Sequence, residues 1–222
     1  PGLHLSVRER QTVEQVLAQG VGQSAPSIRR LARAVSVFVL KITLLGIKPA
    51  IWRRVRVPGN LTLGNLHEII QVVMDWTDDH LHEFTVGGQR YADTMTVEDP
   101  DCLDERDVTL DELGLASSTR LTYIYDFGDA WKHTILVERV VDAGVFPPNE
   151  RGTVVCVSGE RAAPPEDCGG IFGYMRLQEL LSQPDESLDA NELELVELFG
   201  DEFDPEEFDT DAVNRIFRGE TD

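Results

Sequence analysis

The sequence predicts an α+β domain. Apolar residues alternate with period two over residues 35–45, 51–57, 120–126 and 131–141, which is typical of strands, and they recur with helical spacing after Thr62. The order strand, strand, helix, strand, short turn, strand is that of a β-grasp (ubiquitin-like) core. We therefore expect a β-grasp-like mixed sheet with one packed amphipathic helix, C-terminal helices and a helical N-terminal extension.

The 222 residues suit one domain with an appendage. We expect residues 1–34 to form a basic helical extension and residues 35–222 to form a single α+β domain. Within that domain, residues 35–142 would be the core, and residues 143–222 a loop and helical C-terminal part.

The extension begins with a capping box, Ser6 and Glu9, which predicts a helix over residues 6–19, and Ser27 precedes a second, short basic helix. The segment from Val35 is apolar on both of its alternating faces, so it predicts an interior strand. Its expected partner over residues 51–57 carries three arginines.

Thr62 is expected to begin the amphipathic helix. Its apolar face contains Leu63, Leu66, Ile69, Ile70 and Val73. Residues 82–87, a Gly-Gly turn and Tyr91 predict a short hairpin, and residues 93–108 an acidic loop.

The strands over residues 120–126 and 131–141 are expected to pair antiparallel across the sequence FGDA. Pro and Gly are frequent over residues 144–170, which predicts irregular structure there. The segment GYMRLQELLSQ and residues 188–199 and 210–217 predict three C-terminal helices.

The chain carries 40 Asp and Glu against 20 Lys and Arg, a net charge of −20. The basic residues gather before residue 58, where ten Lys and Arg accompany two acidic residues. The acidic remainder repels phosphate backbones, so nucleic acid could bind only through the basic N-terminal region. Charge pairing within one fold is the simpler use of this asymmetry.

Three cysteines without a dense pattern argue against a secreted disulfide scaffold. The sequence has no run of about 18 apolar residues and no signal-peptide pattern at its start. We therefore expect a cytoplasmic protein that makes no membrane contact.

Functional side chains concentrate in the segments HLH (80–82), YDFGDAWKH (125–133) and PPEDCGG (164–170). The candidate binding residues are His80, His82, Tyr125, Asp126, Asp129, Trp131, His133, Glu166, Asp167, Gly169 and Gly170. A structural role is the alternative, because Gly128 suits a positive φ at a hairpin tip and aspartates often bind turn amides. The PPEDCGG segment could likewise be a loop pinned to the sheet by apolar contacts.

A divalent metal ion is the one cofactor that these residue types suggest. His80 and His82 share a face if their segment is extended, with carboxylates close by. The candidate ligands are His80, His82, His133, Cys156 and Cys168. A zinc site drawn from His133, Cys156 and Cys168 lacks an obvious fourth ligand, and no catalytic residue is assigned.

Several motifs follow one another in a family-specific order: IWRRVRVP, LHEIIQVVMDW, HLHEF, YDFGDAWKH, PPEDCGG with GY, and FDPEEFD. On these motifs the chain resembles the Ri-plasmid ORF-three-like family over about residues 36–217. Some members are named TnpR resolvases or insertion-element passenger proteins, which implies a link to mobile elements. The resemblance implies a shared fold and shared residues, and no established reaction.

We interpret the chain as a non-catalytic binding or adaptor module for a protein or small-molecule partner. Its polar site would be formed by the HLH, YDFGDAWKH and PPEDCGG segments. The first alternative is a metal-assisted hydrolase or another enzyme that uses the His/Asp/Glu cluster. The second is a DNA-binding protein of a mobile element that acts through the basic N-terminus.

Overall fold

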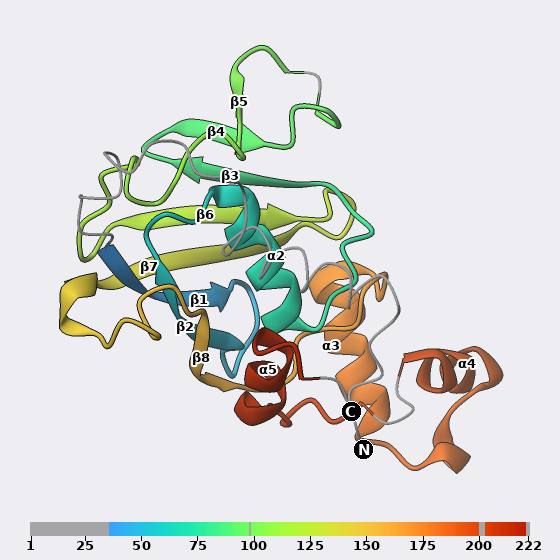
Figure 1. The fold of residues 1–222 in the computed structure, drawn as a ribbon. Helices are drawn as coiled ribbons and strands as arrows, with labels where there is room; N and C mark the ends of the chain where they lie inside the picture. The colour runs from blue at the N-terminus through green and yellow to red at the C-terminus, as the bar shows by residue number, and fades with distance from the viewer. Residues whose placement is uncertain (1–35, 98, 200–202, 221–222) are drawn as a thin grey trace.

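The computed structural model describes residues 36–97, 99–199 and 203–220, and these residues build an eight-stranded sheet (Figure 1). The strands are β1 (Ser36–Leu44), β2 (Trp52–Pro58), β3 (His82–Val86), β4 (Gln89–Ala92), β5 (Cys102–Asp104), β6 (Arg120–Tyr125), β7 (Trp131–Asp142) and β8 (Val155–Glu160). Their order across the sheet is β5-β4-β3-β6-β7-β1-β2-β8. All neighbours pair antiparallel except β4 and β5, which makes the sheet mixed.

Helix α2 (Leu63–Met74) lies across one face of this sheet (Figure 1). The remaining helices of the described residues are η1 (Ala143–Val145), α3 (Gly170–Leu181), η2 (Asp185–Ser187), α4 (Ala190–Phe199) and α5 (Thr210–Phe217). Helix α5 contacts β8 and α2, and α4 contacts α3. Of the C-terminal helices, α5 therefore lies at the β8 edge, and α4 packs on α3.

Helix α2 has a defined start and end. The Thr62 hydroxyl accepts a hydrogen bond from the amide of Asn65, and the Asn65 side chain accepts one from the amide of Thr62. The helix ends at Asp75, whose φ of 59° is left-handed. The amide of Asp75 donates to the carbonyls of Gln71 and Val72, so the loop that follows leaves the helix in a fixed direction.

One face of the sheet and the apolar face of α2 form the core. On β1, alternate residues Phe38, Leu40, Ile42 and Leu44 are buried in the same cluster as the apolar face of α2. β1 lies between β2 and β7, as expected of an interior strand, while Lys41 on its other face is only half-buried.

The α+β class with one packed amphipathic helix is confirmed, and the strands and helices expected after residue 35 are present. The β-grasp likeness stays a prediction, because the sheet has additional strands. β5 lies within the expected acidic loop and β8 within the expected irregular segment. The extension over residues 1–34, with its two expected helices, falls outside the described residues.

Two arginines of β2 form ion pairs with acidic residues later in the chain. Arg54 forms a two-pronged ion pair with Glu138 on β7, with nitrogen–oxygen distances of 2.6 and 2.8 Å. Arg56 lies 3.6 Å from Glu150. Part of the positive charge before residue 58 is therefore used inside the fold, as the simpler interpretation of the charge asymmetry predicts.

Candidate functional site

Three segments far apart in the sequence meet at one end of the sheet. They are the loop after α2 (75–81), the tip of the β6–β7 hairpin (126–130) and the loop before α3 (161–169). The amide of Asp126 donates to the carbonyl of Leu81 at 2.9 Å. The PPEDCGG loop joins them through side chains of Glu166 and Asp167.

His80 stands between two aspartates. Its Nε2 lies 3.2 Å from Oδ1 of Asp167 and 3.9 Å from Oδ2 of Asp126. The His80 side chain is 27% exposed and that of Asp167 73%, whereas Asp126 is buried. We call the residues His80, Asp126, Asp129, Glu166 and Asp167 the acidic junction.

The hairpin tip is shaped by Asp126. Its Oδ1 accepts a hydrogen bond from the amide of Gly128 at 2.8 Å, which is the expected turn-capping role. The positive φ angles belong to Asp126 (54°) and Ala130 (56°), so the expectation that Gly128 supplies one is wrong. Because the capping uses Oδ1, Oδ2 remains directed to His80.

Glu166 ties the PPEDCGG loop to the loop after α2. Its Oε2 accepts hydrogen bonds from the amide of Thr77 at 2.6 Å and from the hydroxyl of Thr77 at 2.5 Å. Its Oε1 accepts one from the hydroxyl of Tyr125 at 2.5 Å. Burial, together with this carboxylate, raises the pKa of Tyr125, so its hydroxyl stays protonated as a donor.

Asp129 contacts Gly169 and Gly170 at the same end of the sheet. The amide of Gly169 donates to Oδ2 of Asp129 at 3.2 Å. Gly170 has a φ of 66°, and a Cβ there would lie 2.8 Å from the carbonyl oxygen of Asp129. Glycine is therefore required where α3 begins against the hairpin. Of the apolar side chains that follow, Tyr174 is buried and Phe172 is 87% exposed.

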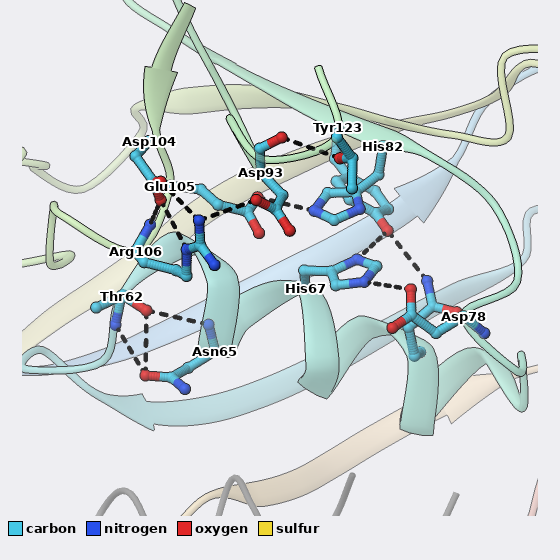
Figure 2. A network of polar contacts seen from close by, with 12 residues as sticks. Thr62, Asn65, His67, Asp78, His82, Asp93, Asp104, Glu105, Arg106 and Tyr123 are labelled. Carbon is cyan, nitrogen blue, oxygen red and sulfur yellow. Dashed lines mark hydrogen bonds and ion pairs between the residues drawn. The ribbon is translucent and has the colours of Figure 1, made fainter. Parts of the chain in front are cut away.

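A second cluster of histidine and carboxylate side chains lies between α2 and β3 (Figure 2). The rings of His67 and His82 are stacked, with centroids 3.4 Å apart. Nε2 of His67 lies 2.8 Å from Oδ1 of Asp78, and Nε2 of His82 lies 2.7 Å from Oε2 of Glu105. Each buried imidazole thus has its own carboxylate.

Hydrogen bonding decides the tautomer of His67. The buried hydroxyl of Tyr123 accepts from the Gln71 side chain at 3.1 Å, so its own proton is directed to Nδ1 of His67 at 2.8 Å. Nδ1 is then the acceptor, and Nε2 carries the proton given to Asp78. Burial lowers the pKa of His67, which keeps the ring neutral.

Glu68 lies beside this second cluster on α2. Burial raises its pKa to about 7, and the nearby carboxylates of Asp78 and Glu105 act in the same direction. Glu68 therefore differs from the exposed carboxylates of the chain because it is largely withdrawn from solvent.

His133 and Trp131 take no part in the polar contacts of the acidic junction. Both are fully buried, and neither nitrogen of His133 nor Nε1 of Trp131 has a hydrogen-bond partner among the described residues. Burial lowers the pKa of His133 to about 3. The neutral ring packs edge-on against Trp76, with centroids 5.5 Å apart.

The candidate metal ligands do not come together at one place in the fold. Over the described ranges, the groups whose ligand atoms lie within 4.8 Å of one another are His67–Asp78–His82 and His80–Asp126–Asp167. His80 and His82 fall in different groups because β3 begins at His82 and His80 lies in the loop before it. Cys156, Cys168 and His133 belong to neither group. Burial raises the pKa of the Cys156 thiol to about 11 and that of Cys168 to about 12.

Sequence reasoning missed His67, Glu105 and Arg53. His67 occupies the polar border of an amphipathic helix, and Glu105 lies within a run of acidic residues, so neither stands out locally. The one signal in the sequence was the pair of ionisable residues, His67 and Glu68, between the apolar residues Leu66 and Ile69. Arg53 looked like its neighbours on β2, yet it is 1% exposed.

Within the described part of the chain, no helix combines the length and the apolar character that crossing a bilayer requires.

Comparisons with known proteins find a matching family model and a similar protein. The family model described as plasmid pRiA4b ORF-3-like protein matches residues 36–212. An uncharacterized protein of Sinorhizobium fredii, y4hQ, is 37% identical over 164 residues, which cover 72% of this chain and 80% of that protein.

A solved structure is also similar. The crystal structure of MM3350, a protein of unknown function from Methanosarcina mazei Go1, has a TM-score of 0.67 and 34% sequence identity. The match covers 81% of this chain and 98% of that one. Neither relative carries an assigned activity.

Proposed function

This chain belongs to the plasmid pRiA4b ORF-3-like family, and from that premise we propose that it is a non-catalytic binding module. The acidic junction is its binding site. The ligand is a positively charged group, carried by a protein or a small molecule.

The charge of the acidic junction carries this proposal. Asp126 and Asp167 flank the imidazole of His80, and Asp129 and Glu166 lie on the same two segments. Among the described residues no Lys or Arg forms an ion pair with any of the four carboxylates. Glu138, in contrast, is paired with Arg54. A group of unneutralised carboxylates attracts cations and raises their local concentration.

The use of the carboxylate oxygens favours binding over catalysis. Asp126 and Asp129 each devote one oxygen to a backbone amide, and Glu166 devotes both to Thr77 and Tyr125. These contacts make a rigid frame. His82 and His133, which the hydrolase alternative requires at the same pocket, have their contacts elsewhere. A rigid frame with few free functional groups suits recognition.

Exposed apolar side chains accompany the junction. Leu81 is 43% exposed and adjoins His80, Phe127 is 50% exposed and adjoins Asp126, and Phe172 follows Gly170 on α3. Aromatic residues beside a charged site are typical of protein interfaces. They favour a protein partner that presents a Lys or Arg side chain.

We propose the cytoplasm as the compartment. Cys102, Cys156 and Cys168 are free thiols, as is usual where glutathione keeps cysteines reduced. A role in a mobile element, with nucleic acid bound by the basic extension, remains a second expectation for residues outside the described ranges.

The test is binding of a labelled Lys/Arg-rich peptide to the full chain, followed by fluorescence anisotropy, with an acidic peptide of equal length beside it. Asp167→Asn removes one charge and keeps a residue that tolerates the left-handed φ of 58°. We expect it to weaken binding by about tenfold, or about 1.4 kcal/mol.

Asp101→Asn is the matched control, because it removes one exposed charge near β5 and away from the junction. Equal weakening by both variants would mean unspecific attraction to an acidic protein and would contradict the proposal. Equal affinity for the acidic peptide would contradict it as well.

A further inference from the structure

We propose that the acidic junction is a divalent transition-metal site whose ligands are Nε2 of His80, Oδ2 of Asp126 and Oδ1 of Asp167. This inference rests on the proposed function and names a cation of the same site. It adds a metal ion as a second cation for the same carboxylates, and this ion and the cationic side chain of a partner compete for the junction.

The spacing of the three atoms fits a common ion. Nε2 of His80 lies 3.2 Å from Oδ1 of Asp167 and 3.9 Å from Oδ2 of Asp126, and all three atoms lie within 4.8 Å of one another. Atoms bound to one zinc ion at 2.0–2.2 Å in tetrahedral geometry lie about 3.4 Å apart. Small side-chain rotations bring the three atoms to that spacing.

A second observation concerns the His80 nitrogen itself. Nε2 is shielded from solvent, although the side chain is partly exposed, and it has no hydrogen-bond partner among the described residues. Its contact with Asp167 has an ion-pair distance without the alignment of a hydrogen bond. A shielded nitrogen without a partner is costly, and coordination of an ion by its lone pair removes that cost.

The surroundings hold two of the ligands in place. The amide of Gly128 fixes Oδ1 of Asp126, which leaves Oδ2 for the ion. The ring of Tyr125 contacts the His80 ring edge-on, with centroids 5.8 Å apart. Contacts of this kind orient metal ligands before the ion arrives.

The donor set selects the class of ion. One imidazole with two carboxylates suits Zn²⁺ or Mn²⁺, whereas Cu⁺ prefers sulfur ligands and Ca²⁺ prefers oxygen alone. Three protein ligands leave open positions on the ion, which water would fill. Asp167 is exposed, so solvent reaches these positions.

The other candidate group, His67, Asp78 and His82, is a weaker site. Its two rings are parallel within 6° and stacked at 3.4 Å. The lone pair of an imidazole nitrogen lies in the plane of its ring, so an ion in the plane of one stacked ring lies outside the plane of the other. Nε2 of both rings is also already bonded to a carboxylate.

The experiment is isothermal titration of the full chain, freed of metal with EDTA, with ZnCl₂ and with MnCl₂. We expect one ion per chain and at least a tenfold loss of affinity in both His80→Ala and Asp167→Asn. Asp101→Asn should bind like the wild type. Absence of binding, or equal affinity of His80→Ala and the wild type, would overturn the metal site.

The peptide assay repeated in EDTA separates the two proposals. If the cationic peptide still binds through Asp167 while neither metal ion binds, the metal inference fails and the proposed function stands. If neither peptide nor metal binds at the junction, the proposed function fails too.

Discussion

The imidazole rings of His67 and His82 lie face to face, with centroids 3.4 Å apart and 6° between their planes. The stack joins α2 to β3, and Nε2 of each ring is hydrogen-bonded to a carboxylate (Figure 2). Two protonated rings at this distance would repel each other, so the arrangement requires that at least one ring is neutral. The neutral ring of His67 therefore stacks on His82 and links the helix to the sheet.

His67→Ala should reduce the free energy of unfolding by about 2–4 kcal/mol, because it removes the stack and leaves the buried Tyr123 hydroxyl without its acceptor. Urea denaturation at pH 7 measures this loss. His80→Ala, which removes an imidazole from the partly exposed junction, should cost less than about 1 kcal/mol. Equal losses in the two variants would show that the stack does not stabilise the fold.

His133→Phe should make stability less sensitive to acid. The folded protein holds the pKa of His133 at about 3, below its unfolded value near 6.5. As pH falls below 6.5 the unfolded chain binds a proton that the folded chain refuses, so stability falls. Between pH 7 and pH 5 this removes about 2 kcal/mol from the wild type, a loss that the variant avoids.

Urea denaturation at both pH values tests this expectation. His67 contributes in the same direction in both proteins and cancels in the comparison. If the free energy of unfolding decreased equally in wild type and variant between pH 7 and pH 5, the pKa of His133 would not be lowered in the folded state.

Arg53→Lys should destabilise the fold by about 2–4 kcal/mol. The guanidinium donates to the carbonyls of Val73, Trp52 and Glu160 at 2.7–3.0 Å and lies 3.7 Å from the centre of the Phe208 ring. A lysine cannot replace these contacts together. Burial lowers the pKa of Arg53 to about 10, so the group is still charged at neutral pH.

Arg54→Lys is the control for Arg53→Lys, because Arg54 lies on the same strand in a partly exposed ion pair with Glu138. We expect it to cost at most about 1 kcal/mol in the same urea titration. A cost equal to that of Arg53→Lys would contradict the importance of the buried contacts.

Tyr125→Phe should loosen the frame of the acidic junction without unfolding the domain. The change removes the donor to Glu166 and the acceptor of the Asp79 amide. Amide hydrogen exchange should become faster at Thr77 and Asp79, whose amides depend on these contacts. Tyr91→Phe, on β4, is the control, and similar exchange at Thr77 in both variants would refute the role of the Tyr125 hydroxyl.

Local patterns predicted the parts of the fold that are governed by local physics. Thr62 was expected to begin the amphipathic helix, and it caps α2. The strand pair around FGDA was expected from its period-two pattern, and it forms β6 and β7. β5 escaped prediction because three residues are too few to show a period, and it is held by parallel pairing with β4.

The residues of the acidic junction were also predictable from local sequence, whereas those of the stacked histidine pair were not. The segments HLH, YDFGDAWKH and PPEDCGG stood out by composition, and side chains from all three meet at the acidic junction. The stacked pair did not stand out, because His67 and Glu105 are ordinary residues of a helix and an acidic loop until the sheet places them beside His82. Whether an arginine such as Arg53 turns inward is likewise decided by carbonyls distant in sequence.

Adding Mn²⁺ to the isotope-labelled full chain and following its amide signals shows whether the acidic junction binds a cation. A paramagnetic ion broadens only the signals of nearby nuclei. We expect the amide signals of His80, Gly128 and Gly169 to broaden first in the wild type and not in Asp167→Asn. Broadening that spreads over the acidic helix α4, or that Asp167→Asn leaves unchanged, would contradict it.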